Sequence, residues 1–132
     1  LTTNQGVVMD KIWLVALGGA VGSCMRYGVS LLSAGRLGTG FPYGTLLANV
    51  IGCFIIGAFM AAATERVITN PNLRFLVVVG FCGGLTTFSS YSYETIKLLE
   101  EAGLQYALLN ILTNMVLGSL ATWLGIMAVK AI

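Results

Sequence analysis

The chain has 132 residues, of which 57% are hydrophobic and only 9% are charged, and its formal net charge is +2. A soluble domain carries about 25% charged residues, so this composition excludes an ordinary water-soluble domain and predicts an integral membrane protein of one small domain. The small net charge and the scattered basic residues speak against a nucleic-acid partner. Three cysteines, Cys24, Cys53 and Cys82, have neither disulfide nor metal-site spacing, and we interpret them as buried free thiols.

The first apolar segment, residues 12–32, is long enough to cross a hydrocarbon core of ~30 Å at ~1.5 Å per residue. Residues 1–10 before it are short and polar, and we expect them to be frayed. Gly18 and Gly22 are spaced four apart, which predicts the close approach of another helix. Arg26 is costly inside a membrane, so it either meets water, carbonyls or a partner there, or extends from the last turns of the helix to the interface.

A glycine-rich loop over residues 33–43 is predicted to separate the first segment from the second, residues 44–63. Pro42 cannot sit inside a helix, so the second helix begins after it, with Thr45 as a cap or early-turn residue. Asn49 is the strongly polar side chain in the middle of this segment. We interpret Asn49 either as an interhelical hydrogen bond that stabilises a bundle or as a polar group that lines a pathway.

The third apolar segment, residues 73–99, is interrupted by a stretch of glycines and hydroxyl-bearing residues: Gly80, Gly83, Gly84, Thr86, Thr87, Ser89 and Ser90. Adjacent glycines favour a break in a helix, and hydroxyls can satisfy the backbone groups that a break frees. In lipid, a break survives only where it is buried in protein or lines a polar cavity, the setting in which ion and substrate sites are built. A kink that merely allows close packing is the alternative.

After the break, Phe88, Tyr91 and Glu94 recur every three residues. They therefore lie close to one face of a helix predicted over residues 87–101. Glu94 is near the far end of this segment, where it is either an ordinary interfacial carboxylate or the mouth of a polar path.

The fourth apolar segment, residues 104–129, carries a polar stripe. Asn110, Asn114, Gly118 and Thr122 recur every four residues, with Ser119 beside them. Spacing of four keeps these groups on one side of a helix, where they either bind other helices or line a hydrated path. The basic residues divide four against two or three between the two sides of a four-span chain, so the positive-inside signal is weak and an antiparallel homodimer is compatible with it.

Three motifs are similar to those of the Fluc/CrcB fluoride channels. They are Gly83-Gly84-Leu85-Thr86-Thr87-Phe88-Ser89 in the third segment, Gly44-Thr45-Leu46 followed by Asn49 and Gly52 in the second, and Gly18, Gly19 and Gly22 followed by Arg26 in the first. The resemblance extends from Lys11 onward and includes the number of spans and the loop lengths.

The resemblance implies an all-α membrane protein with four transmembrane helices, the third broken at mid-membrane, that assembles as an antiparallel dual-topology homodimer. It implies a passive, fluoride-selective channel that exports fluoride across the bacterial cytoplasmic (inner) membrane, with two antiparallel pores per dimer. It also implies a structural sodium ion at the dimer centre, held by the backbone carbonyls of Gly83 and Thr86. The implied partners are fluoride, the lipid bilayer and a second copy of the chain.

The resemblance also assigns the pore by motif position. The implied pore residues are Asn49, Thr87, Phe88, Ser90, Tyr91, Asn114 and Ser119, with Glu94 near the vestibule and Arg26 and Thr45 in supporting positions. Tyr91 stands where the family usually has Phe, and Ser90 where it usually has Thr. The tyrosine adds a hydroxyl to the expected pore wall, so we expect conduction to survive and the rate or the sensitivity to blockers to change.

Two other functions compete with this one. A proton-coupled small multidrug transporter is also a four-span, dual-topology protein, but its mechanism needs a buried carboxylate in the first span, where this chain has Arg26 and no acid. A non-transporting structural subunit would explain the glycines but not the asparagine stripe. An enzyme is not expected, because the chain has no His and no evident nucleophile–base pair.

Overall fold

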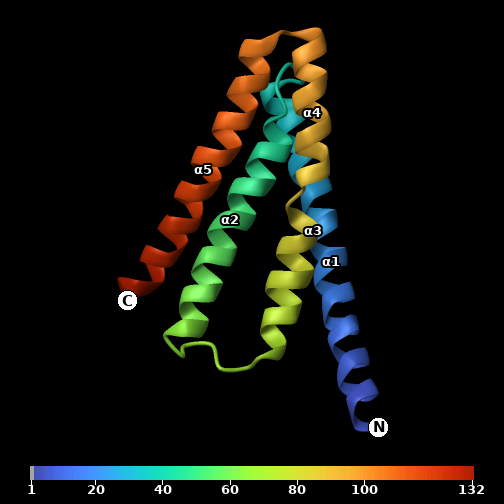
Figure 1. Ribbon diagram of the computed structural model, residues 1–132, viewed down its shortest axis with the longest axis vertical. Coiled ribbons are helices and arrows are strands. Elements are labelled where there is room, and N and C mark those ends of the chain that lie inside the picture. Colours follow the sequence, from blue (N-terminus) through green and yellow to red (C-terminus); the bar gives the residue numbers. More distant parts are fainter. Residues whose placement is uncertain (1) are drawn as a thin grey trace.

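The computed structural model describes residues 2–132, which are helical apart from short connections (Figure 1). The elements are α1 (Thr2–Leu37), α2 (Tyr43–Thr64), the π-helical η1 (Arg74–Cys82), α3 (Gly83–Leu85), α4 (Phe88–Glu101) and α5 (Leu104–Lys130). Within this described range, four helical segments are long and apolar enough to cross a membrane, and η1, α3 and α4 together form the third of them. The prediction of an all-α protein with four helices able to span a membrane is therefore confirmed.

Helix α1 extends beyond the predicted first span at both ends (Figure 1). It begins at Thr2, so residues 2–10 are helical rather than frayed, while residue 1 lies outside the described range. It ends at Leu37, inside the stretch predicted as a loop. Nothing before that point stops a helix, because an isolated glycine costs only about 1 kcal/mol there and both prolines lie further along the chain. The helix ends where Gly38 takes a left-handed conformation, with φ of +81°.

The helices form two closely packed groups, α1 with η1 and α3, and α2 with α5 (Figure 1). A methyl group on Gly18 would collide with the carbonyl oxygen of Leu76, and one on Gly22 would collide with that of Phe81. The prediction that these two glycines allow a close helix approach is confirmed. Gly57 has the same role in the other group, where it lies directly against the backbone of α5.

Replacing Gly22 by Ala is expected to lower the melting temperature of the purified protein. A Cβ atom at Gly22 would also lie 2.9 Å from the Leu85 amide nitrogen, and backbone atoms cannot move aside as a flexible side chain can. Overpacking of this kind costs about 1–3 kcal/mol. Gly28→Ala is the matched control, because a Cβ atom there meets nothing within 4 Å. Equal melting temperatures of the two variants in detergent would contradict the packing described for Gly22.

The three cysteines are free thiols that differ in burial. Cys82 is buried as predicted, Cys53 is half-buried, and Cys24 is exposed, which contradicts our interpretation for that residue. Cys24 follows Gly22 by two residues, which is about 200° around the helix. It therefore points away from the contact with η1 and α3 that buries Gly22.

Candidate functional site

The third segment changes its backbone conformation at two threonines. Helix α3 ends at Leu85, Thr86 and Thr87 are extended with ψ of 154° and 119°, and α4 begins at Phe88. Thr87 caps α4, because its Oγ1 accepts a hydrogen bond from the Ser90 backbone N–H at 3.1 Å. The extended residues therefore free backbone groups that a continuous helix would use internally.

Asn49 binds the backbone of Thr87 from the neighbouring helix α2. Its Oδ1 accepts a hydrogen bond from the Thr87 N–H at 2.8 Å, and its Nδ2 lies 3.4 Å from the Thr87 carbonyl oxygen. The same Nδ2 donates to Oδ1 of Asn114 on α5 at 3.0 Å. One half-buried amide thus joins α2, the extended threonines and α5.

Asn114 is oriented by the preceding turn of its own helix. Its Nδ2 donates to the Asn110 carbonyl oxygen at 3.0 Å and to Asn110 Oδ1 at 3.1 Å. Asn110 is fully buried, with an exposed fraction of 1%. Both asparagines of the predicted polar stripe therefore face the interior of the helix bundle.

Phe88 and Tyr91 lie one turn apart at the start of α4, with ring centroids separated by 5.5 Å and ring planes at 47°. The Phe88 side chain is 77% exposed, whereas Tyr91 is half-buried. The Phe88 ring is thus exposed on the surface of the chain, and the half-buried Tyr91 ring packs beside it.

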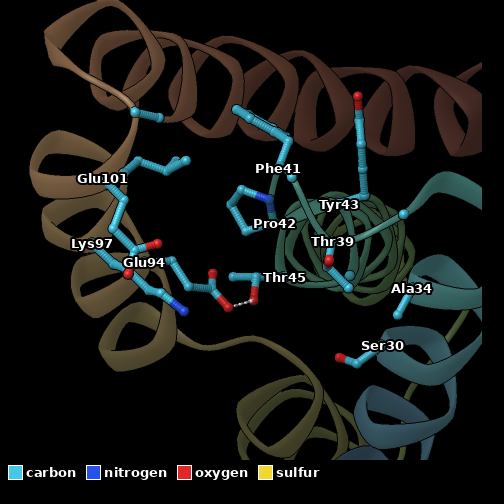
Figure 2. Close-up of a pocket in the computed structure, with 15 residues that line it drawn as sticks. Ser30, Ala34, Thr39, Phe41, Pro42, Tyr43, Thr45, Glu94, Lys97 and Glu101 are labelled. Carbon is cyan, nitrogen blue, oxygen red and sulfur yellow. Dashed lines mark hydrogen bonds between the residues drawn. The ribbon is translucent and has the colours of Figure 1, made fainter.

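Glu94 lies beside a cavity of about 340 Å³, at the end of the molecule where the connection between α1 and α2 meets α4 (Figure 2). Its Oε1 accepts a hydrogen bond from Oγ1 of the buried Thr45 at 2.9 Å. Its Oε2 is buried and has no hydrogen-bond partner among the described residues. Lys97 and Glu101 line the same cavity, one and two turns further along α4. The carboxylate of Glu94 is therefore half-buried at the cavity, with one oxygen held by Thr45 and the other without a partner among the described residues.

The carbonyl oxygens of Gly83 and Thr86 lose the amide partners that a continuous helix would give them. The N–H that would reach the Gly83 oxygen belongs to Thr87 and donates to Asn49 instead. The N–H that would reach the Thr86 oxygen belongs to Ser90 and donates to the Thr87 side chain. Such carbonyl oxygens are ligands that hard cations prefer.

The hydrogen bonds among Asn49, Thr87, Asn114 and Asn110 form one polar cluster between α2, α4 and α5, and Ser119 and Arg26 lie outside it. Ser119 is exposed, and in the part of the chain that the structure describes no hydrogen bond joins it to the asparagines. It follows the buried Gly118 by one residue, which turns it about 100° away from the interior. Arg26 is half-buried on α1, apart from the contacts between α2, α4 and α5 that form the cluster.

Two further residues belong to the cluster although the sequence did not single them out as site residues. Nδ2 of Asn110 donates to Oγ1 of Thr95 on α4 at 2.9 Å. The two residues lie seven positions after and eight positions before Gly103, where the chain turns from α4 into α5. Residues that are nearly equally many positions before and after the turn of a helical hairpin lie opposite each other. This spacing was the signal that could have paired Thr95 with Asn110.

The long apolar helices and the neutral polar cluster between them define a multi-pass membrane protein with polar groups inside its helix bundle. The model of the family described as CrcB-like protein, Camphor Resistance (CrcB), matches residues 13–126. The chain therefore belongs to this family.

Several similar proteins carry the name fluoride-specific ion channel FluC. The protein from Geobacter sp. (strain M21) is 44% identical over 124 residues, which are 94% of this chain and 100% of that protein. The protein from Geobacter sulfurreducens is 46% identical over 125 residues, covering 92% of this chain and 98% of that protein. The protein from Koribacter versatilis is 44% identical over 118 residues, covering 89% and 92%. The resemblance to the Fluc/CrcB family is confirmed.

Proposed function

We propose that the protein is a passive, fluoride-selective ion channel that exports fluoride across the bacterial cytoplasmic membrane and so lowers its concentration in the cell. The observation that carries the proposal is the contact between Asn49 and Asn114, where neutral amides from two helices meet the freed backbone of Thr87. The relatives named as fluoride-specific channels support fluoride as the ion.

Neutral hydrogen-bond donors suit a small and tightly hydrated anion. Moving a carboxylate-sized ion into a medium of ε ≈ 4 costs about 20 kcal/mol, and a smaller anion costs more. A pore must therefore replace the lost water with donors, and several neutral donors let the ion leave again where one fixed cation would retain it. Besides the Asn49 amide, such donors are the hydroxyls of Thr87 and Ser90 and the positive ring edges of Phe88 and Tyr91.

The Asn49 amide has one donor that an ion can engage without breaking a short hydrogen bond. Its contact with the Thr87 carbonyl oxygen is 3.4 Å long, whereas its contact with Asn114 is 3.0 Å. In our proposal fluoride replaces the Thr87 carbonyl as the acceptor, and the shorter bond to Asn114 keeps the amide in place. Asn49 then touches the ion, and Asn114 orients Asn49.

The proposed channel is an antiparallel homodimer with two pores, in which the third helix is broken at mid-membrane. Phe88 is 77% exposed where α4 begins, and Gly83 is exposed beside the extended threonines. Both surfaces are uncovered in the single chain, and a second copy related by a two-fold axis would cover them. The weak bias in the distribution of basic residues supports insertion in both orientations.

The residues around the extended threonines fit a structural sodium ion at the dimer centre. The carbonyl oxygens of Gly83 and Thr86 would hold it, since the N–H groups that would pair with them in a helix donate elsewhere. When bound, the ion supplies a positive potential that does not titrate. A cavity of about 290 Å³ is lined by Asn49 together with Gly83 and Thr86, so this potential would act beside the proposed ion path.

Export by this route needs no coupling ion. Neutral HF crosses bilayers and dissociates at the cytoplasmic pH, and the charged fluoride cannot leave unaided. A negative-inside potential favours the exit of an anion by about 2.3 kcal/mol per 100 mV. A passive path is therefore sufficient to lower the fluoride concentration in the cell.

Fluoride efflux from liposomes that contain the purified protein tests this function. A fluoride electrode follows the release after valinomycin is added to let potassium carry the compensating charge. We expect rapid fluoride release, with no chloride release and no fluoride release from protein-free liposomes. If the folded protein released no fluoride, the channel function would be rejected.

A further inference from the structure

Beyond Asn114, the hydrogen bonds continue through two residues that have no role in the ion path proposed above. Nδ2 of Asn114 donates to Oδ1 of Asn110 at 3.1 Å, and Nδ2 of Asn110 donates to Oγ1 of Thr95 at 2.9 Å. The Thr95 hydroxyl donates in turn to the Tyr91 carbonyl oxygen at 2.7 Å. Tyr91 follows Thr87 by four residues, so the series that starts at the Thr87 N–H returns to the third segment.

We call this series, which begins and ends in the third segment, the amide ring. Its members are Thr87, Asn49, Asn114, Asn110, Thr95 and Tyr91. It links three helices, because Asn49 belongs to α2, Asn114 and Asn110 to α5, and the remaining members to α4 and its N-cap. Along the series each member donates to the next, from Thr87 towards Tyr91, and the longer contact of Asn49 Nδ2 with the Thr87 carbonyl oxygen lies outside it.

Backbone groups at both ends of the amide ring force that direction. The Thr87 N–H can only donate, so Asn49 must turn its oxygen to Thr87 and its nitrogen to Asn114. The Tyr91 carbonyl can only accept, so the single proton of the Thr95 hydroxyl goes there and Thr95 must accept from Asn110. Each amide between these ends has one orientation that satisfies both of its neighbours.

The amide ring is most constrained at its buried end. Asn110 has an exposed fraction of 1%, and a buried amide left without a partner loses its hydration with no compensation. Asn49 and Asn114 are half-buried, so water can compete for their hydrogen bonds. The buried pair that Asn110 forms with Thr95 fixes the side-chain oxygen of Asn110 towards Asn114, and so adds a second acceptor to the Asn110 carbonyl oxygen that already orients Asn114.

We propose that Thr95 and Asn110 are positioning residues of the ion path. Together with the Asn110 carbonyl oxygen and the Thr87 N–H, they hold Asn114 with its oxygen towards Asn49, and Asn49 with its nitrogen in the position where the proposed function has it donate to fluoride. This inference rests on the proposed function and adds two residues to it. Because Thr95 bonds the Tyr91 carbonyl, the same pair ties the orientation of the amides to the turn of α4 that carries the aromatic rings.

Thr95→Val tests the proposal because it removes the hydroxyl and keeps the β-branched shape. Nδ2 of Asn110 then loses its acceptor, so Asn110 Oδ1 no longer has a fixed position beside Asn114, and Asn114 and Asn49 lose the part of their orientation that this oxygen supports. We expect the maximum fluoride efflux to fall about tenfold, the factor that corresponds to the loss of about one net hydrogen bond. Thr95→Ser keeps the hydroxyl and is expected to conduct at nearly the wild-type rate.

Thr122→Val is the matched control. Thr122 is a half-buried threonine of α5 whose Oγ1 donates to the Gly118 carbonyl oxygen of its own helix at 3.1 Å, outside the amide ring. It is expected to conduct like the wild-type protein. A general loosening of the helix bundle by loss of a buried hydroxyl would affect both valine variants alike.

A second readout follows the Asn49 side chain directly, through the ¹⁵N and ¹H resonances of its amide group in the purified protein. These resonances are expected to shift in Thr95→Val and to keep their positions in Thr95→Ser and Thr122→Val. Thr95 does not contact Asn49 directly, because Asn110 and Asn114 lie between them in the amide ring. A shift of the Asn49 resonances in Thr95→Val therefore reports a change of orientation that is transmitted through these two residues.

Wild-type efflux or unshifted Asn49 resonances in the folded Thr95→Val protein would overturn the proposal. If Thr95→Val does not fold, Thr95→Ala removes the same hydroxyl with a smaller side chain and is judged by the same two readouts. Shifted Asn49 resonances in a protein whose wild type releases no fluoride would support the amide ring and reject the proposed function instead.

Discussion

Asn49→Asp is expected to abolish fluoride efflux while the protein stays folded. The aspartate keeps the shape of the side chain and still offers an oxygen to the Thr87 N–H, which lies 2.8 Å from Asn49 Oδ1. It replaces Nδ2, the donor that faces both Asn114 and the Thr87 carbonyl, by a second oxygen. The expected loss therefore comes from the proposed ion path and not from the support of the extended threonines.

Two effects act together at the introduced aspartate. A negative charge 4 Å from fluoride opposes it by about 4 kcal/mol at an effective dielectric constant of about 20, which is about a thousandfold in occupancy. The new carboxylate oxygen also faces the Asn114 oxygen, and Asn114 can turn only by giving up its two hydrogen bonds to Asn110. We therefore expect efflux at the level of protein-free liposomes.

Asn72→Asp is the control for the added charge. Asn72 is exposed in the connection that precedes η1, so the same substitution there is expected to leave efflux at the wild-type rate. Melting temperatures of both variants show whether each is folded. Wild-type efflux by a folded Asn49→Asp protein would remove Asn49 from the lining of the path.

The long helices could be predicted from the sequence because apolar stretches of about 20 residues in a chain this poor in charge leave few alternatives. The ends of α1 could not be predicted in the same way. Its polar first turns can be helical or frayed at little difference in free energy, and its C-terminal end is decided by the conformation of Gly38 rather than by the first glycine or serine after the apolar stretch. Propensities of this size are too small to place a helix boundary.

Asn49 and Asn114 could each be predicted as polar members of the site, but their contacts could not. Asn49 and Asn114 stand out because a polar amide in an apolar helix needs a partner. Their spacing places each on a face of its helix, but it does not say which helix that face meets, and their contact joins residues 65 positions apart. The contact between Thr45 and Glu94 joins residues 49 positions apart and was missed for the same reason.

Thr95 was missed for a different reason. Threonine is common on the surface of helices, where its hydroxyl bonds its own backbone as Thr113 does here, so it gives no signal by itself. Its role appears only when the antiparallel register of α4 and α5 is known, because that register places it opposite Asn110. Ser119 stands next to the stripe but is exposed in the single chain, so its assignment to the pore stays a prediction.

Gly83→Cys is expected to cross-link two copies of the chain. Gly83 is exposed and a Cβ atom there meets nothing within 4 Å, so the substitution does not disturb the fold of one chain. In the proposed dimer the Gly83 carbonyls of both copies face one sodium ion, which places the two residues beside each other across the two-fold axis. Disulfides form between residues whose Cα atoms are about 4.4–6.8 Å apart.

The experiment replaces the natural cysteines by serine, so that the introduced thiol is the one that reacts. After mild oxidation in membranes, we expect most of the Gly83→Cys protein to migrate at twice the chain mass of 13.9 kDa on a non-reducing gel and to return to the chain mass on reduction. A protein that stays monomeric under these conditions would contradict a dimer centred on the extended threonines.

Gly40→Cys separates an antiparallel dimer from a parallel one. Gly40 is exposed with open space around its Cα, but it lies in the connection between α1 and α2, at one end of the helix bundle (Figure 1). An antiparallel pair places the two copies of this residue on opposite sides of the membrane, so Gly40→Cys is expected to stay monomeric. An antiparallel pair brings identical residues together only near the middle of the bilayer, and cross-linking at Gly83 but not at Gly40 would place the extended threonines at that depth.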